Sequence, residues 1–362
     1  MGERDGVAEK KGDRANLSNS GTDASSQRFL QEVQDYLRLG RQKDSGEVKA
    51  DASREIPVVT KSEKQGERDY KISFMSDGRE RSFQIHLPKH VDSNTPIMLI
   101  LHGANAGKAD GVMSKMTGMN NLADKNDFIA IYPLSLDPTR KGLNSWNADN
   151  TLAGQINPTY DDTNYIKHLL NVTALQFGLD KKHVAVVGFS DGAAFANHLV
   201  SKMDGQFEFI ATVCGTILEG EPVARKPPEK ALFIQSGSDP YMLPYRGGEG
   251  LITKFNNQKG LPGVPELPNL SLSNPSQQPS QYAESSTWSP VMSVGSRGTQ
   301  EYVNVGKRTT VEVVNIPGSQ HGWPGSTEGW PVIGESYKHF NASERVVRSW
   351  LGIKLPTTIK LK

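Results

Sequence analysis

The sequence predicts an α/β protein with a mainly parallel, doubly wound sheet that helices cover on both faces. Short runs of almost continuously apolar residues recur between residues 97 and 316, and stretches with helical periodicity lie between them. Strands buried on both faces lack polar alternation, and alternating strands and helices build parallel sheets. The expected strands are 97–101, 128–132, 183–187, 209–213, 231–234 and 311–316, and the expected helices are 113–124, 162–177 and 192–203.

An antiparallel hairpin is expected before the parallel sheet. Apolar residues alternate with polar ones from Tyr70 to Phe74 and again over residues 83–87. Between them, Asp77-Gly78 is a residue pair that favours a two-residue hairpin turn. We therefore expect ordered structure to begin at about residue 69.

The chain divides by composition into three parts. Residues 1–68 are polar and charge-balanced and are expected to be disordered, except for a short amphipathic helix near 26–39. Residues 69–353 form the expected catalytic domain, and 354–362 form a C-terminal tail. Within the domain, residues 246–299 form a long insertion rich in proline and serine. We expect this insertion to be either a lid over the site or a disordered surface segment.

Composition excludes several classes of function. The 362 residues include 41 basic and 40 acidic side chains, so there is no excess positive charge to bind nucleic acid. No stretch approaches the roughly 18 apolar residues that are needed to span a bilayer. Cys214 is the single cysteine, which excludes an intramolecular disulfide and a multi-cysteine metal site. We expect its thiol to be packed in the core.

The segment Gly-Phe-Ser-Asp-Gly at residues 188–192 is the strongest functional signal. It lies between an expected strand and an expected helix, a context that holds a serine in a strained turn with its hydroxyl exposed above the sheet. The following helix directs its N-terminal amides at the same place, which favours developing negative charge. Ser190 is therefore the expected nucleophile.

Two later residues supply the acid and the base that such a serine needs. Asp239 follows the expected strand 231–234, and His321 follows the strand 311–316 in a loop. The chain order Ser, Asp, His is that of the α/β-hydrolase fold. We expect His321 to act as general base and Asp239 to orient its imidazole.

Backbone amides are the expected donors to the oxyanion. The strand 97–101 ends in His102-Gly103, and this fold takes one donor from that loop and another from the residue after the nucleophile. The expected donors are the amides of Ala104 and Asp191, with His102 as a structural brace. The expected walls of the substrate pocket are the aromatic side chains of Trp146, Tyr241 and Trp323.

A series of short motifs resembles the family of polyhydroxybutyrate depolymerases and feruloyl and acetylxylan esterases. The motifs run in order from about residue 70 to 351, and His-Gly-Trp-Pro-Gly at 321–325 and Ser-Trp-Asn at 145–147 are specific to that group. The resemblance implies an α/β-hydrolase fold with Ser190, Asp239 and His321 as the catalytic triad, and Asp162 as a structural acid. It also implies secretion, although residues 1–6 lack the apolar core of a signal peptide.

The expected function is a serine carboxylic ester hydrolase that needs neither metal nor cofactor. Short polyesters and carbohydrate-linked acyl or feruloyl esters, as small molecules or as polymers, are the expected substrates. Compared with the family, the chain lacks cysteine pairs near residue 146 and carries a longer insertion at 246–299, which argues against polymer degradation more than against ester hydrolysis. A prolyl-oligopeptidase-type peptidase and a non-catalytic binding protein on a hydrolase scaffold remain the alternatives.

Overall fold

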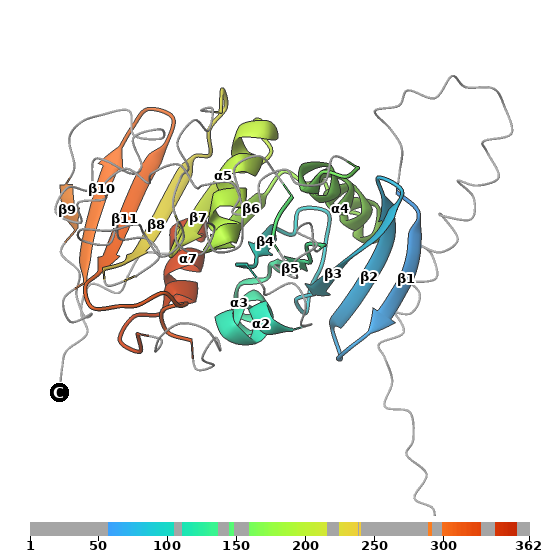
Figure 1. Cartoon of the computed structure of the whole chain (residues 1–362), viewed down its shortest axis with the longest axis horizontal. Helices are drawn as coiled ribbons and strands as arrows, with labels where there is room; N and C mark the ends of the chain where they lie inside the picture. Colours follow the sequence, from blue (N-terminus) through green and yellow to red (C-terminus); the bar gives the residue numbers. More distant parts are fainter. Residues whose placement is uncertain are drawn as a thin grey trace, which may run out of the picture. The chain divides into compact units, whose positions relative to one another are not determined.

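One mixed sheet runs through the part of the chain that the computed structural model describes (Figure 1). The described residues are 57–104, 111–136, 145–147, 159–215, 224–237, 239, 289–291, 299–326 and 337–352. Within them the sheet has 11 strands in the order β1-β2-β3-β5-β4-β6-β7-β8-β11-β10-β9. The strands are β1 (Val59–Lys64), β2 (Asp69–Ser76), β3 (Arg79–His86), β4 (Ile97–Leu101), β5 (Ile129–Pro133), β6 (Val184–Phe189), β7 (Phe209–Val213), β8 (Lys230–Ser236), β9 (Ser289–Val291), β10 (Gln300–Val305) and β11 (Thr310–Ile316).

The centre of the sheet is parallel, as the apolar runs predict. Strands β5, β4, β6, β7, β8 and β11 pair in parallel in that order, and every residue of β4 to β7 is buried. The parallel centre and the crossover between β5 and β4 confirm the predicted α/β-hydrolase fold.

Antiparallel strands extend the sheet on both sides. Strands β2 and β3 form the expected hairpin, whose turn residues Asp77 and Gly78 have φ of 50° and 68°, typical of a type I′ turn. Strand β1 lies within the segment 1–68 and pairs with β2, so the sheet begins earlier in the chain than predicted. Most of β1 is exposed, and its polar residues carry no apolar alternation that could have signalled a strand. Strands β9 and β10 were also not predicted, and β9 lies within the insertion 246–299.

Helices cover both faces of the sheet. The helices α4 (Asp162–Phe177) and α5 (Asp191–Lys202) pack their apolar side chains into one core layer. The helices α2 (Val112–Thr117), α3 (Met119–Asn126) and α7 (Ala342–Leu351) pack into the core layer of the opposite face. The single helix expected over 113–124 is divided at Gly118, whose left-handed backbone (φ 60°) ends α2 and precedes α3.

Some expectations lie outside the described residues. These are the amphipathic helix near 26–39, most of the insertion 246–299 and the tail 354–362. Within the described part of the chain, no helix combines the length and the apolar character that a membrane crossing requires.

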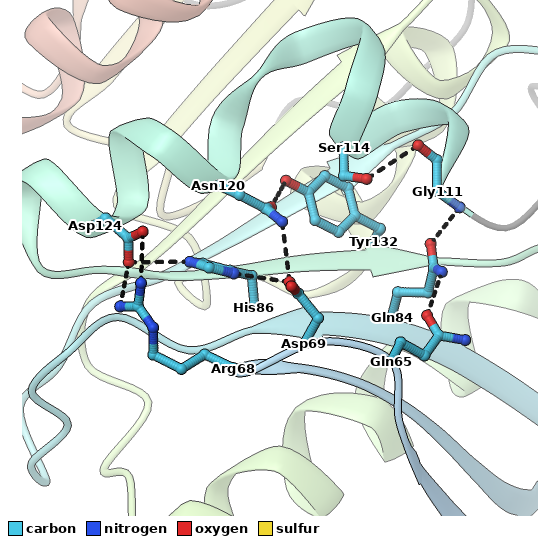
Figure 2. Close-up of polar contacts among 10 residues, drawn as sticks. All are labelled: Gln65, Arg68, Asp69, Gln84, His86, Gly111, Ser114, Asn120, Asp124 and Tyr132. Atoms are coloured by element: carbon cyan, nitrogen blue, oxygen red, sulfur yellow. Dashed lines mark hydrogen bonds and ion pairs between the residues drawn. The ribbon is translucent and has the colours of Figure 1, made fainter. Parts of the chain in front are cut away.

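A polar cluster joins the β2–β3 hairpin to α3 (Figure 2). His86 lies between two carboxylates, with Nδ1 at 2.8 Å from Asp69 Oδ1 and Nε2 at 3.1 Å from Asp124 Oδ1. Arg68 donates two hydrogen bonds to the Asp124 carboxylate, at 2.5 and 2.8 Å, and Asn120 donates one to Asp69. The cluster therefore ties the antiparallel strands β2 and β3 to helix α3.

The cluster predicts an acid-sensitive contribution to stability. Partial burial raises the pKa of Asp124, but hydrogen bonds and charge from Arg68 and His86 outweigh it and leave the pKa below its ordinary value. A lowered folded-state pKa adds stability above the ordinary carboxyl pKa, and this stability is lost as the pH falls through the folded value. We expect Asp124→Asn to lower the free energy of unfolding by about 1 kcal/mol at neutral pH, or roughly 2 °C in Tm.

Thermal melts of wild type and variant at pH 7 and at about pH 3 test this prediction. The Tm difference should shrink at the acid pH, because protonation of Asp124 weakens its contacts with Arg68 and His86 as the pH falls toward the lowered pKa. Glu63→Gln is the control, since Glu63 is 45% exposed in a surface pair with Lys61. A Tm difference of equal size at both pH values would contradict the assignment.

Candidate active site

Ser190 lies in a sharp turn between β6 and α5. Its backbone has φ 54° and ψ −118°, a combination that is unfavourable for a residue with a side chain. Its amide donates to the Val213 carbonyl at 3.0 Å, which ties the turn to the neighbouring strand. A Cβ on Gly192 would stand 2.5 Å from the His102 carbonyl oxygen, so only glycine fits there. The serine is thus held in the strained elbow that the sequence predicts.

The ends of β8 and β11 bring the expected acid and base to the serine. His321 Nδ1 lies 2.7 Å from Asp239 Oδ2, and His321 Nε2 lies 2.9 Å from Ser190 Oγ. The tautomer that satisfies both contacts donates from Nδ1 to the carboxylate and accepts the serine hydroxyl at Nε2. The carboxylate is fully buried and the imidazole is 6% exposed. The three residues form one hydrogen-bonded series at the carboxyl edge of the parallel strands.

A buried network of small polar side chains supports the loop that carries His321. Cys214 Sγ donates to the Gly322 carbonyl and lies 3.0 Å from Ser236 Oγ, which in turn lies 3.0 Å from Ser319 Oγ. Burial, together with the charge of Asp239, raises the pKa of the Cys214 thiol to about 12. The thiol is 1% exposed and stays protonated, as expected of a packed core cysteine.

The expected oxyanion donors flank Ser190. Asp191 follows it directly as the first residue of α5, where backbone amides have no partner in the preceding turn of the helix. On the other side, a Cβ on Gly103 would stand 3.0 Å from Ser190 Cβ, so the loop after β4 passes against the serine. The Gly103–Ala104 peptide of that loop carries the second expected donor.

Two of the three expected pocket residues belong to the core. Trp146 has no exposed surface and stacks between His102 and Phe195, with ring centroids at 4.5 and 4.6 Å. Trp323 is 2% exposed and donates its indole N–H to Ser343 Oγ. We therefore correct the assignment of both tryptophans from pocket walls to supports behind the site. The third, Tyr241, lies outside the described residues.

Asp162 acts as a buried anchor at the start of α4. Its carboxylate accepts from Arg81 Nη2 at 2.5 Å and from the Asn147 amide at 2.6 Å, and both charged side chains are fully buried. Arg81 also lies 3.8 Å from the centroid of the Tyr165 ring. The structural role that the resemblance implied for Asp162 is thus explained by a partner, Arg81, that the sequence did not reveal.

A family comparison matches the chain from the end of β2 to just beyond Asp239. Residues 75–240 match the model of a family described as "Putative esterase". The chain is esterase-like over this segment. The matched segment contains Ser190 and Asp239, whereas His321 lies beyond it.

Curated relatives agree with this family at low identity. The chain is 24% identical over 190 residues to a bifunctional acetylxylan esterase/xylanase of Neocallimastix patriciarum, covering 52% of this chain and 25% of that protein. It is 26% identical over 200 residues to the protein NocK of Nocardia uniformis subsp. tsuyamanensis, which carries the same description as the family, covering 54% of each chain. The chain thus spans about a quarter of the length of the first relative and about half of the length of the second.

A solved structure of an acetyl xylan esterase from Aspergillus awamori is also similar to the chain. It has 15% sequence identity and a TM-score of 0.42, and the match covers 67% of this chain and 89% of that chain.

The esterase-like domain holds one further buried group that sequence reasoning missed. Asp191 was expected to contribute only its backbone amide, but its carboxylate is also buried and accepts a hydrogen bond from Ser145 Oγ at 2.5 Å. The two residues are 46 positions apart, and no local pattern indicates such a pair. No group of three or more His, Cys, Asp or Glu side chains in the described ranges could hold a metal ion.

Proposed function

We propose that the protein is a serine carboxylic ester hydrolase. The observation that carries the proposal is the hydrogen-bonded series from Ser190 Oγ through His321 to the buried Asp239 carboxylate, beside a strained serine backbone. The match of residues 75–240 to an esterase family supports the same reaction class.

The proposed reaction has two halves. Ser190 Oγ attacks the ester carbonyl carbon while its proton passes to His321 Nε2, and the tetrahedral oxyanion is held by the Ala104 and Asp191 amides. The alcohol leaves with the proton from His321, so that an acyl-enzyme remains. Water then attacks the acyl carbon, His321 takes a proton from it and returns that proton to Ser190, and the acid leaves. Asp239 keeps the imidazole oriented and stabilises its charged form throughout.

Short polyesters and carbohydrate-linked acyl or feruloyl esters are the proposed substrates. One relative's printed name, acetylxylan esterase/xylanase, supports the acetylated carbohydrate within this range. The side chain of Tyr241, two residues after the acid, remains our proposed aromatic contact for the substrate.

Labelling by a fluorophosphonate and hydrolysis of p-nitrophenyl butyrate test the proposal together. We expect turnover of the ester, covalent label on the peptide that contains Ser190, and loss of turnover in proportion to labelling. A folded protein that neither takes the label nor hydrolyses the ester would be the non-catalytic scaffold instead. Faster cleavage of a matched amide than of the ester would favour a peptidase. A panel of acetylated xylan, a feruloyl ester and 3-hydroxybutyrate oligomers then ranks the ester classes.

A further inference from the structure

The side chain of Asp191 links the nucleophile turn to the segment 145–147. Asp191 is 3% exposed at the first position of α5, where the helix dipole favours its negative charge. Its Oδ2 accepts from Ser145 Oγ at 2.5 Å and from the Trp146 backbone amide at 3.3 Å. A hydrogen bond from a hydroxyl to a buried carboxylate is short and strong, so the segment is held firmly against the elbow.

Trp146 carries the connection onward to the loop after β4. Its indole Nε1 donates to the His102 carbonyl at 2.9 Å, and its ring stacks on the His102 imidazole at an interplanar angle of 26°. Its other face stacks on Phe195 of α5. A single rigid side chain thus spans the space between the helix after the nucleophile and the expected oxyanion loop.

The His102 side chain orients the peptide between Gly103 and Ala104. Burial lowers the pKa of its imidazole to about 4, so the ring is neutral near pH 7. Its Nε2 accepts the Ser135 amide at 3.1 Å, which leaves Nδ1 to donate to the Gly103 carbonyl at 2.8 Å. In a planar trans peptide the C=O and N–H point in opposite directions. Holding the Gly103 oxygen therefore sets the direction of the Ala104 N–H.

We propose that Ser145, Trp146 and the side chain of Asp191 are positioning residues that set the separation and direction of the two oxyanion donors. We call these three side chains the bridge, because they connect the two donors. At one end, the Asp191 amide belongs to the residue whose carboxylate accepts from Ser145. At the other end, the Ala104 amide lies on the peptide whose carbonyl accepts from His102. This inference rests on the proposed function, because it matters only if an oxyanion forms at Ser190. It assigns to the bridge an effect on the transition state and not on substrate binding.

Two variants remove single hydrogen bonds of the bridge. Ser145→Ala removes the hydroxyl that donates to Asp191, and Trp146→Phe removes the indole N–H that donates to the His102 carbonyl. The chain offers a matched control for each. Ser349→Ala removes a hydroxyl that donates to Glu312 at 2.6 Å, and Trp350→Phe removes an indole N–H that donates to Glu208 at 2.6 Å.

Steady-state kinetics on p-nitrophenyl butyrate, affinity for a trifluoromethyl ketone and thermal melts are measured for all four variants. The ketone forms a tetrahedral adduct with the serine and places an oxyanion at the two amides. We expect both bridge variants to lower kcat about tenfold with little change in KM, and to weaken the ketone by the same factor. The two controls should lose comparable Tm and keep kcat and ketone affinity.

The outcomes separate the two proposals. If wild type hydrolyses the ester and the bridge variants keep wild-type kcat and ketone affinity while losing Tm, the bridge is core packing only and the inference is wrong. The same holds if bridge and control variants lose kcat equally. If folded wild type neither hydrolyses the ester nor reacts with the fluorophosphonate, the proposed function fails and the positioning role falls with it. Ser145→Ala removes only one oxygen atom, which keeps the test usable if Trp146→Phe does not fold.

Discussion

Ser190→Ala is expected to lower kcat for ester hydrolysis about a millionfold, because the covalent route through the acyl-enzyme is lost. Binding should change little, since the alanine removes one oxygen atom and leaves the amides of the elbow in place. The remaining turnover should still exceed the uncatalysed rate, because the oxyanion donors act without the nucleophile. The measurement is single-turnover and steady-state hydrolysis of p-nitrophenyl butyrate.

Ser190 and His321 should act as one unit in this experiment. Adding His321→Ala to Ser190→Ala should cost almost nothing further, because a base without its nucleophile has no function. Ser201→Ala is the matched control, since Ser201 lies on the same helix and its hydroxyl donates to the local His198 carbonyl. Substantial turnover that survives in Ser190→Ala would remove Ser190 from the mechanism.

Asp239→Asn is expected to lower kcat by about ten-thousandfold. The buried carboxylate accepts the Nδ1–H of His321 at 2.7 Å and so leaves Nε2 free to accept the serine hydroxyl. An amide can present its NH₂ to Nδ1 instead, which places the imidazole proton on Nε2 and disables the base. Loss of charge also removes the stabilisation of the imidazolium that forms during attack.

Glu208→Gln controls for the general effect of changing a carboxylate that contacts a histidine. Glu208 Oε2 lies 2.9 Å from His183 Nδ1, a distance close to the 2.7 Å of the Asp239–His321 pair. We expect this variant to retain kcat. Fluorophosphonate labelling of Ser190 should slow in Asp239→Asn but not in Glu208→Gln, and equal kinetics in the two variants would refute the orienting role of Asp239.

The strands of the parallel centre and the positions of Ser190, Asp239 and His321 were predictable from the sequence because each depends on a local signal. A buried strand is a continuous apolar run, a hairpin turn is an Asp-Gly pair, and a nucleophile elbow is a serine between glycines. Parallel strands place their carboxyl ends at one edge, so residues that follow such strands converge there.

Features without a local signal were missed. Strand β1 is mostly exposed and polar, and only its pairing with β2 identifies it as a strand. The Arg81–Asp162 pair joins residues 81 positions apart, and the Ser145–Asp191 bond joins residues 46 apart. The sequence could not distinguish a tryptophan that lines a pocket from one that supports the site from behind, because both can occur in the motifs that resemble the esterase family. Trp146 and Trp323 were misassigned for this reason.

The register between β8 and β11 has a consequence for how this scaffold can change. Residues 230–236 and 310–316 pair one to one in parallel, and this pairing brings the ends that carry Asp239 and His321 together whatever chain connects them. Lengthening a connection costs little, since doubling a loop adds only about 0.6 kcal/mol of closure entropy. The strand pairing therefore keeps the acid and the base at their spacing when the connection between β8 and β11 changes in length. The connection can thus diverge in evolution, or be varied by design, without a change in the relative positions of Asp239 and His321.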